Sequence, residues 1–116
     1  MTDRSFETLA GRVGDTPVLK VSGVLGENAR LLVKLEGDNP TGSVKDRACV
    51  TMLRAMMCDP CWSPSKVLLD ASSGNMGCSL AYFGRVLGVK VRIISSAKLT
   101  AEKRVFMENI SEASSR

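Results

Sequence analysis

Residues 67–94 read VLLDASSGNMGCSLAYFGRVLGVKVRII, and this stretch decides the fold class. It begins with a short apolar run at 67–70 and ends with another at 89–94, each typical of a buried strand. Residues 76–87 have the length of a helix and carry several small side chains, which allow close approach to a sheet, and Gly88 suits the C-terminal cap. A strand, a helix and a strand in this order favour two parallel strands joined by a crossover helix.

The same alternation extends to both sides of this unit. Downstream, a last helix is expected after Thr100. Upstream, residues 44–57 suit a largely buried helix that ends near Cys58, because prolines follow it. Still earlier, 18–21 and 30–36 are predicted strands that could pair as a hairpin. We therefore predict an α/β fold, a three-layer parallel sheet with covering helices.

The composition is that of a small globular domain. The chain has 116 residues, of which 44% are hydrophobic and 24% are charged, a balance that excludes a disordered chain. Its net charge of +4 comes from scattered basic residues and not from the patch or stripe typical of nucleic-acid binding, so no nucleic-acid partner is expected. The sequence has no histidine, which removes the usual general base and the commonest metal ligand.

Four cysteines leave two interpretations open. Cys58 and Cys61 form a CxxC pair that a zinc or redox site could use, but zinc would also need the other thiols or carboxylates. Cys49 and Cys78 fall inside predicted helices, and we favour idle thiols in a reducing compartment. Residues 1–15 lack the apolar core of a signal peptide, and no apolar run reaches membrane-spanning length. A cytoplasmic protein with no membrane partner is expected.

The turn inside residues 67–94 is chemically rich. Ser72-Ser73-Gly74-Asn75 places hydroxyls, a side-chain amide and an open backbone at a helix N-terminus, where N–H groups and the helix dipole attract an anion. A carboxylate or a phosphate would suit this place. An ordinary helix cap, in which Asn75 or Ser73 satisfies the first amides, explains the same residues.

A second turn, NPTGSVKDR at 39–47, places Lys45 in the first turn of a predicted helix. Ser43 and Asp46 have the spacing of a capping box. The positive end of the helix dipole, partial burial and the charge of Arg47 would all disfavour the ammonium form of the lysine. Such an amine could react with an aldehyde. A solvated lysine that tolerates the dipole explains the position equally well.

Four blocks of the sequence, taken in order, resemble the N-terminal part of the cysteine synthase family, fold-type II enzymes that use pyridoxal 5'-phosphate (PLP). The blocks are 14–19, 39–47, which resembles the PLP-lysine motif, 72–77, which resembles the substrate loop, and 89–103. The resemblance implies a tryptophan synthase β-like fold. It also implies a transferase or lyase of amino-acid biosynthesis that replaces the β-substituent of an O-activated serine.

The resemblance further implies a role for each residue of the two turns. Lys45 would be the catalytic residue, holding PLP through an imine and then moving the α-proton of the substrate. Asn75 would hydrogen-bond the ring oxygen of the cofactor. The carboxylate of a small amino-acid substrate would be bound by Ser72, Ser73, Gly74 and Met76. A homo-oligomer, or association with a complementary domain, is expected.

The sequence departs from the family pattern in two ways. Met76 stands where relatives commonly have threonine, which removes a hydroxyl donor and leaves the second substrate open. The glycine-rich loop that would hold the PLP phosphate does not follow Gly88, so we expect the N-terminal portion of a longer enzyme. The expected organisation is a single truncated α/β domain over 1–116, with N-terminal strands in 1–36, the PLP-lysine and substrate loop in 37–110, and a polar tail in 111–116.

Two other functions stay open from the sequence. A catalytically inactive homologue could bind a full-length partner through an unpaired sheet edge and an exposed apolar face. A zinc or redox module built on Cys58 and Cys61 is the third hypothesis.

Overall fold

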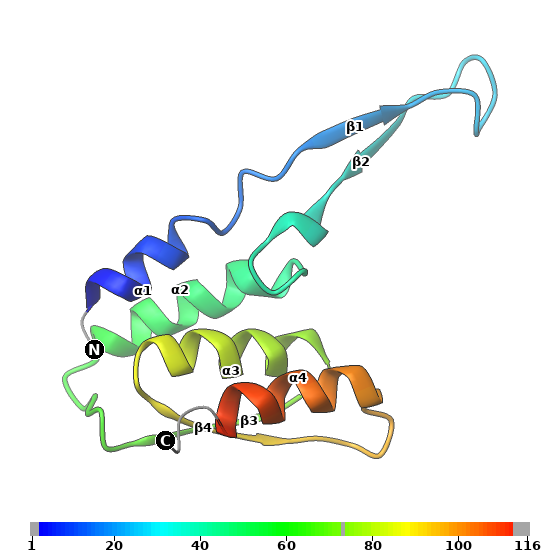
Figure 1. Ribbon diagram of the computed structural model, residues 1–116. Coiled ribbons are helices and arrows are strands. Elements are labelled where there is room, and N and C mark those ends of the chain that lie inside the picture. The colour runs from blue at the N-terminus through cyan, green and yellow to red at the C-terminus, as the bar shows by residue number, and fades with distance from the viewer. Residues whose placement is uncertain (1–2, 73, 113–116) are drawn as a thin grey trace.

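The computed structural model describes residues 3–72 and 74–112. The elements follow one another as α1 (Asp3–Ala10), β1 (Val18–Val21), β2 (Leu31–Lys34), the 3-10 turn η1 (Glu36–Asp38), α2 (Lys45–Met57), β3 (Val67–Ala71), α3 (Asn75–Val86), β4 (Lys90–Ile94) and α4 (Ala101–Glu112). Figure 1 shows a body of helices and strands, from which the hairpin of β1 and β2 projects.

The unit predicted from residues 67–94 is present as β3, α3 and β4. The two strands pair in parallel, with Val67 opposite Lys90 at one end of the ladder. α3 packs closely on the sheet, because a Cβ added at Gly84 would lie 2.4 Å from a methyl carbon of Val91. Gly88 takes a φ of 71° just after the helix, which confirms its predicted place at the C-terminal cap.

Helices α3 and α4 cover one face of this two-stranded sheet. Ile93 of β4 packs against Cys78 of α3 and Met107 of α4. The residues that point to the opposite face are exposed: Val67 at 48%, Leu69 at 63% and Ile94 at 57%. The predicted α/β class, with a parallel sheet and covering helices, is confirmed, and the helices of the described residues lie on one of its faces.

The core lies between α1, α2 and α3. Phe6, Leu53 and Phe83 are at most 2% exposed, and Phe6 meets Phe83 edge-on at 6.2 Å between ring centroids. Helix α1 was not predicted, although apolar residues at 6, 9, 10 and 13 have helical spacing. The end of α2 was predicted near Cys58, and the helix stops at Met57. Helices α1 and α2 pack against α3 on the side away from the sheet.

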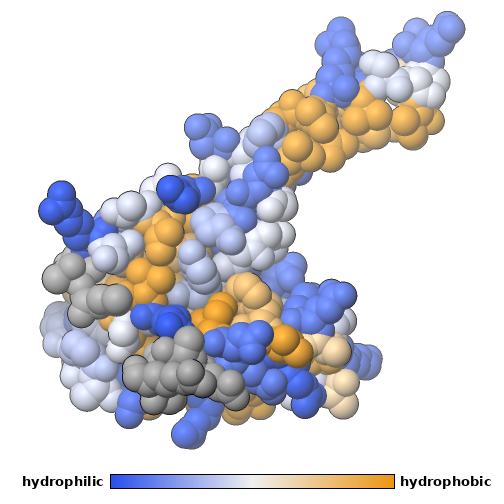
Figure 2. Space-filling view, in the orientation of Figure 1, coloured by the Kyte–Doolittle hydropathy of each residue, from blue (hydrophilic) through white to orange (hydrophobic). Residues whose placement is uncertain are grey.

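The first two strands form an antiparallel hairpin that is separate from the parallel sheet, as the sequence suggested. Leu19 lies opposite Val33, and Val21 lies opposite Leu31. Because opposite residues share a face of the ladder, one face of the hairpin is wholly apolar. Figure 2 shows apolar residues along the projecting hairpin.

Helix α4 extends into the segment predicted as a polar tail. α4 runs to Glu112, so residues 111–112 are helical, and 113–116 lie outside the described residues. No helix in the part of the chain that the structure describes is long and apolar enough to cross a membrane.

Candidate functional site

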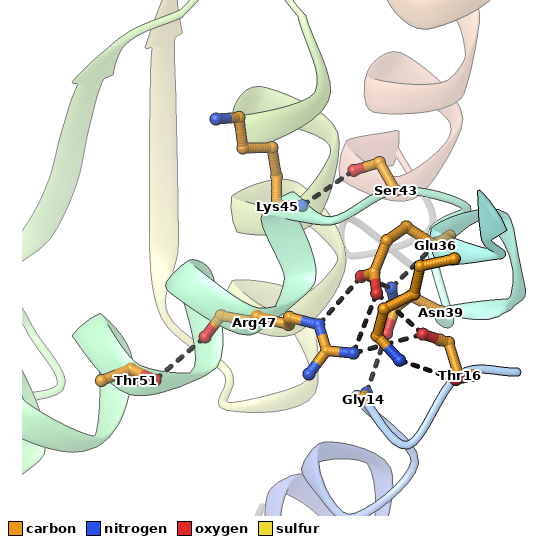
Figure 3. A network of polar contacts seen from close by, with 9 residues as sticks. Gly14, Thr16, Glu36, Asn39, Ser43, Lys45, Arg47 and Thr51 are labelled. Atoms are coloured by element: carbon orange, nitrogen blue, oxygen red, sulfur yellow. Dashed lines mark hydrogen bonds and ion pairs between the residues drawn. The ribbon is translucent and has the colours of Figure 1, made fainter. Parts of the chain in front are cut away.

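Lys45 is the first residue of α2, as the turn at 39–47 predicts. Its side chain is exposed, so the expected partial burial is wrong, and it extends away from the polar network beside it (Figure 3). The hydroxyl of Ser43 accepts the N–H of Lys45 at 3.2 Å. The predicted capping box is also wrong, because α2 has no side-chain cap at Val44 and the carboxylate of Asp46 is engaged elsewhere.

We expected the charge of Arg47 to disfavour the ammonium form of Lys45. The structure instead pairs the guanidinium of Arg47 with Glu36. Nε and Nη2 of Arg47 donate to the two carboxylate oxygens at 2.8 and 2.9 Å. Thr16 and Asn39 also donate to this carboxylate, at 2.7 and 2.8 Å. Arg47 first, then Thr16 and Asn39, lower the pKa of Glu36 to about 2. These motif residues therefore join the early turn at 14–17 to the lysine turn.

The turn after β3 is capped by Ser72. Its hydroxyl oxygen accepts the N–H of Gly77 at 3.0 Å and, more weakly, that of Gly74 at 3.4 Å. The N–H of Ser72 donates to the carbonyl of Ile94 at 3.0 Å, which ties the turn to the end of β4. Ser72 therefore caps this turn and Asn75 does not, while the cap predicted for Ser73 lies outside the described residues.

Open donors remain at the start of α3. Among the described residues, the N–H groups of Asn75 and Met76 meet no acceptor, and the hydroxyl of Ser72 still has its hydrogen to donate. The side chain of Met76 packs against the core, so only its backbone faces the turn. A Cβ added at Gly74 would lie 3.5 Å from Nζ of Lys103. Open amides and a neighbouring ammonium suit a carboxylate.

The two turns lie at the same end of two packed helices. α2 and α3 run side by side and begin on the same side of the molecule (Figure 1). Asp46, the residue after Lys45, accepts the hydroxyl of Ser79 at 2.5 Å, and Ser79 lies one helical turn beyond Asn75. Sequence reasoning missed this contact and also Lys103, because no local spacing connects residues of different elements.

The cysteines divide into two buried and two exposed thiols. Cys49 and Cys78 are buried, while Cys58 and Cys61 are exposed, and all four are free. Within residues 3–72 and 74–112, no three histidine, cysteine or acidic side chains come together as metal ligands. The structure therefore gives the zinc hypothesis no third ligand in the part of the chain that it describes.

Residues 9–111 match the protein family described as pyridoxal-phosphate dependent enzyme. Cysteine synthase B of Pseudomonas aeruginosa is 39% identical over 103 residues, which cover 88% of this chain and 34% of that protein. Cysteine synthase of Aquifex aeolicus is 37% identical over 105 residues, covering 87% and 32%. The crystal structure of a cysteine synthase from Entamoeba histolytica has a TM-score of 0.80 at 30% identity, over 89% of this chain and 32% of that one. This likeness confirms the predicted fold-type II class, and the chain spans about a third of the length of these relatives.

Proposed function

Because the chain belongs to the pyridoxal-phosphate-dependent enzyme family, we propose that it is the N-terminal, lysine-bearing portion of a β-replacement synthase of the cysteine synthase type. Its substrate is an O-activated serine, and its cofactor is PLP. The observation that carries the proposal is the placement of Lys45 and the turn at 72–76 at the same end of two packed helices. The similarity to proteins named cysteine synthase supports it.

The donor set of the two turns fits a cofactor aldehyde and an amino-acid carboxylate. The amine of Lys45 is exposed and has no ion pair within the described residues. The first N–H groups of α3 and the hydroxyl of Ser72 are open to a carboxylate. The sequence has no glycine after Gly88 to form a phosphate loop, so the fit concerns the aldehyde and the carboxylate alone.

Each of these residues would have its own role in the β-replacement reaction. Lys45 Nζ would bond the aldehyde carbon of PLP and later carry the α-proton of the substrate. The side-chain amide of Asn75 would orient the ring oxygen. Ser72, Ser73, Gly74 and Met76 would hold the substrate carboxylate. Bound PLP supplies the electron sink that makes the α-proton acidic.

The loss of the threonine hydroxyl at position 76 changes less than the sequence suggested. The partly buried side chain of Met76 packs against the core, so what it offers to the turn is its backbone N–H, which every residue except proline has. Lys103 stands beside Gly74 and adds a positive charge to the same turn. For the second substrate we propose only its chemical class, a nucleophile such as sulfide.

Covalent labelling tests the proposal directly. The chain is incubated with PLP, reduced with borohydride, digested and mapped by mass spectrometry. We expect a phosphopyridoxyl group on Lys45, its loss in Lys45→Ala, and its retention in Lys90→Ala, which removes another exposed lysine. Cysteine formation from O-acetylserine and sulfide then tests the reaction. Labelling spread evenly over the lysines, unchanged in Lys45→Ala, would contradict the assignment.

A second candidate function is a non-catalytic homologue that binds a full-length relative. It is favoured by the apolar face of the hairpin, where Leu19 is 49% and Val33 is 37% exposed. Size-exclusion chromatography with full-length cysteine synthase B of Pseudomonas aeruginosa should then show a complex that Leu19→Glu disrupts. Leu32→Glu is the matched control, because Leu32 shares the other face with Lys20. Separate elution of the wild-type proteins would rule this candidate out.

Location and assembly belong to the same proposal. A cytoplasmic location is supported by four free thiols, which a reducing compartment preserves. Assembly as a homo-oligomer, or with a complementary domain, is supported by the exposed apolar sheet face. Sedimentation velocity at several protein concentrations tests the assembly, and a single monomeric species at every concentration would contradict it.

A further inference from the structure

Asp46 is a fully buried carboxylate between α2 and α3, with an exposed fraction of 0%. Its Oδ2 accepts the N–H of Thr41 at 2.7 Å. Its Oδ1 accepts the hydroxyl of Thr41 and, at 2.5 Å, the hydroxyl of Ser79. No ion pair to Asp46 occurs among the described residues. Its hydrogen bonds within the described residues therefore come from three neutral donors in two segments.

Each of the two hydroxyl groups has a single hydrogen, so each can donate to only one acceptor. Both hydroxyls lie in reach of the same oxygen of Asp46. A hydrogen bond to a carboxylate is stronger than one to a neutral carbonyl, so Ser79 gives its hydrogen to Asp46. The carbonyl of Asn75 lies 3.1 Å from the same hydroxyl and is the weaker acceptor.

The position of this contact relates it to the two turns of the proposed site. Asp46 follows Lys45 directly, so its bonds fix the first turn of α2. Ser79 lies four residues after Asn75, which places both on one side of α3. The bond between Asp46 and Ser79 thus connects the turn that carries the amine to the turn that carries the amide.

We propose that Ser79 and Thr41, acting through Asp46, are positioning residues that set the separation between Lys45 and Asn75. The inference rests on the proposed function for its chemical meaning. Apolar side chains such as Val50 and Leu53 hold the two helices together, but the hydrophobic effect has no preferred direction. A directional bond at the site end of the helices fixes their register where the amine and the amide must meet one substrate.

The first test measures the separation without cofactor. Spin labels are attached at Lys45→Cys and Asn75→Cys, both exposed, in a background in which Cys58 and Cys61 are replaced by serine. We expect a narrow distance distribution from dipolar EPR, which broadens in Ser79→Ala. Val50→Ala is the matched control, because it weakens the same helix interface without touching Asp46, and the distribution should stay narrow.

A second pair of variants keeps the test valid if Ser79→Ala does not fold. Thr41→Val preserves the shape of the side chain but removes the donated hydrogen, and it should broaden the distribution. Thr41→Ser retains the hydroxyl, and its distance distribution should stay as narrow as that of the wild type. Unchanged distributions in both Ser79→Ala and Thr41→Val would overturn the inference, as would equal broadening in Val50→Ala.

The second test asks whether the hydrogen bond between Ser79 and Asp46 affects the reaction of the Lys45 amine with PLP. The amount of borohydride-trapped phosphopyridoxyl-Lys45 is compared with the binding of pyridoxine phosphate, which has no aldehyde. We expect Ser79→Ala to lower the trapped fraction by about tenfold, the scale of one charge-assisted hydrogen bond, with little change in pyridoxine phosphate binding. If the wild type traps PLP and Ser79→Ala traps as much, the inference fails. If the wild type traps none, the proposed function fails, and the EPR distances still decide the positioning role.

Discussion

Glu36 accepts hydrogen bonds from Arg47, Thr16 and Asn39, which lower its pKa from 4.5 to about 2. Because the folded pKa lies below the unfolded one, this carboxylate stabilises the fold above pH 4.5, and its contribution is lost as pH falls toward 2. We expect the free energy of unfolding to drop over this window. Glu36→Gln should be less stable near neutral pH and should show a smaller drop. Urea unfolding at about pH 7 and about pH 3, followed by circular dichroism, measures both effects.

Glu27→Gln provides the control for this prediction. Glu27 is an exposed carboxyl in the loop of the hairpin, so its replacement changes the charge by the same amount without touching the Glu36 network. Its unfolding curves should match the wild type at both pH values. A Glu36→Gln variant that follows the same curves would show that the network contributes no stability in solution.

The four thiols should react at two very different rates. Burial first, then the charges of Asp46 and Asp70, raise the pKa of Cys49 to about 12, and burial also raises the pKa of Cys78. A thiol with a raised pKa is seldom the reactive thiolate at neutral pH. We expect an aromatic disulfide reagent to modify Cys58 and Cys61 quickly in the native protein and all four thiols after unfolding. Fast modification of Cys49 in the folded chain would contradict its burial.

At the scale of elements, the contact between α3 and β4 depends on the absence of a side chain at Gly84. An added Cβ would lie 2.4 Å from a methyl carbon of Val91, and Val91 has little freedom to turn away. Gly84→Ala should therefore destabilise the fold by about 1–3 kcal/mol, although alanine favours helices more than glycine does. Thermal and urea unfolding measure the change.

Two variants separate this clash from a general effect of replacing glycine. Gly37→Ala should be nearly neutral, because nothing lies within 4 Å of an added Cβ there. Val91→Ala combined with Gly84→Ala should recover part of the lost stability, because it removes the methyl groups in question. Equal losses in Gly84→Ala and Gly37→Ala would mean that close packing is not the cause.

The elements differ in how far their sequence determines them. The unit β3–α3–β4 was predictable, because apolar runs, small helix residues and Gly88 all favour the same structure. α1 was missed, because its eight residues include five that are charged or polar enough for a loop, and burial of Phe6 against Phe83 decides its structure. The capping box at Ser43 failed for a related reason. The carboxylate of Asp46 accepts hydrogen bonds from Thr41 and from Ser79, which lies 33 residues after Asp46 in sequence, in place of the predicted bond within the cap.

The candidate site follows the same division. Lys45 and the turn at 72–76 could be located from the sequence, because each is a local pattern at a helix start. That they lie at the same end of the two helices depends on contacts between elements distant in sequence, and so do the roles of Asp46 and Lys103. Such contacts join residues that no local spacing relates, so they required the structure.

At the scale of the whole molecule, the chain is elongated. Its radius of gyration is 16.8 Å, against about 13 Å for a compact domain of this length. The difference comes from the hairpin, which projects from the body in Figure 1 and leaves apolar side chains such as Leu25 and Leu32 more than 60% exposed. A two-stranded hairpin without a covering layer is only marginally stable.

Hydrogen exchange should therefore divide the chain into two parts. We expect the amides of β1 and β2 to exchange quickly, with those of α2 and α3 the slowest, because only the helices have a buried core. Leu53→Ala removes a side chain that is 2% exposed and should speed exchange in α2 and α3 while leaving the hairpin unchanged. Mass spectrometry of peptides from 18–34 and 45–57 measures both regions. If the hairpin were as protected as the helices, some surface must cover its apolar face in solution. Loss of that protection on dilution of the purified chain would then identify the covering surface as a second copy of the chain.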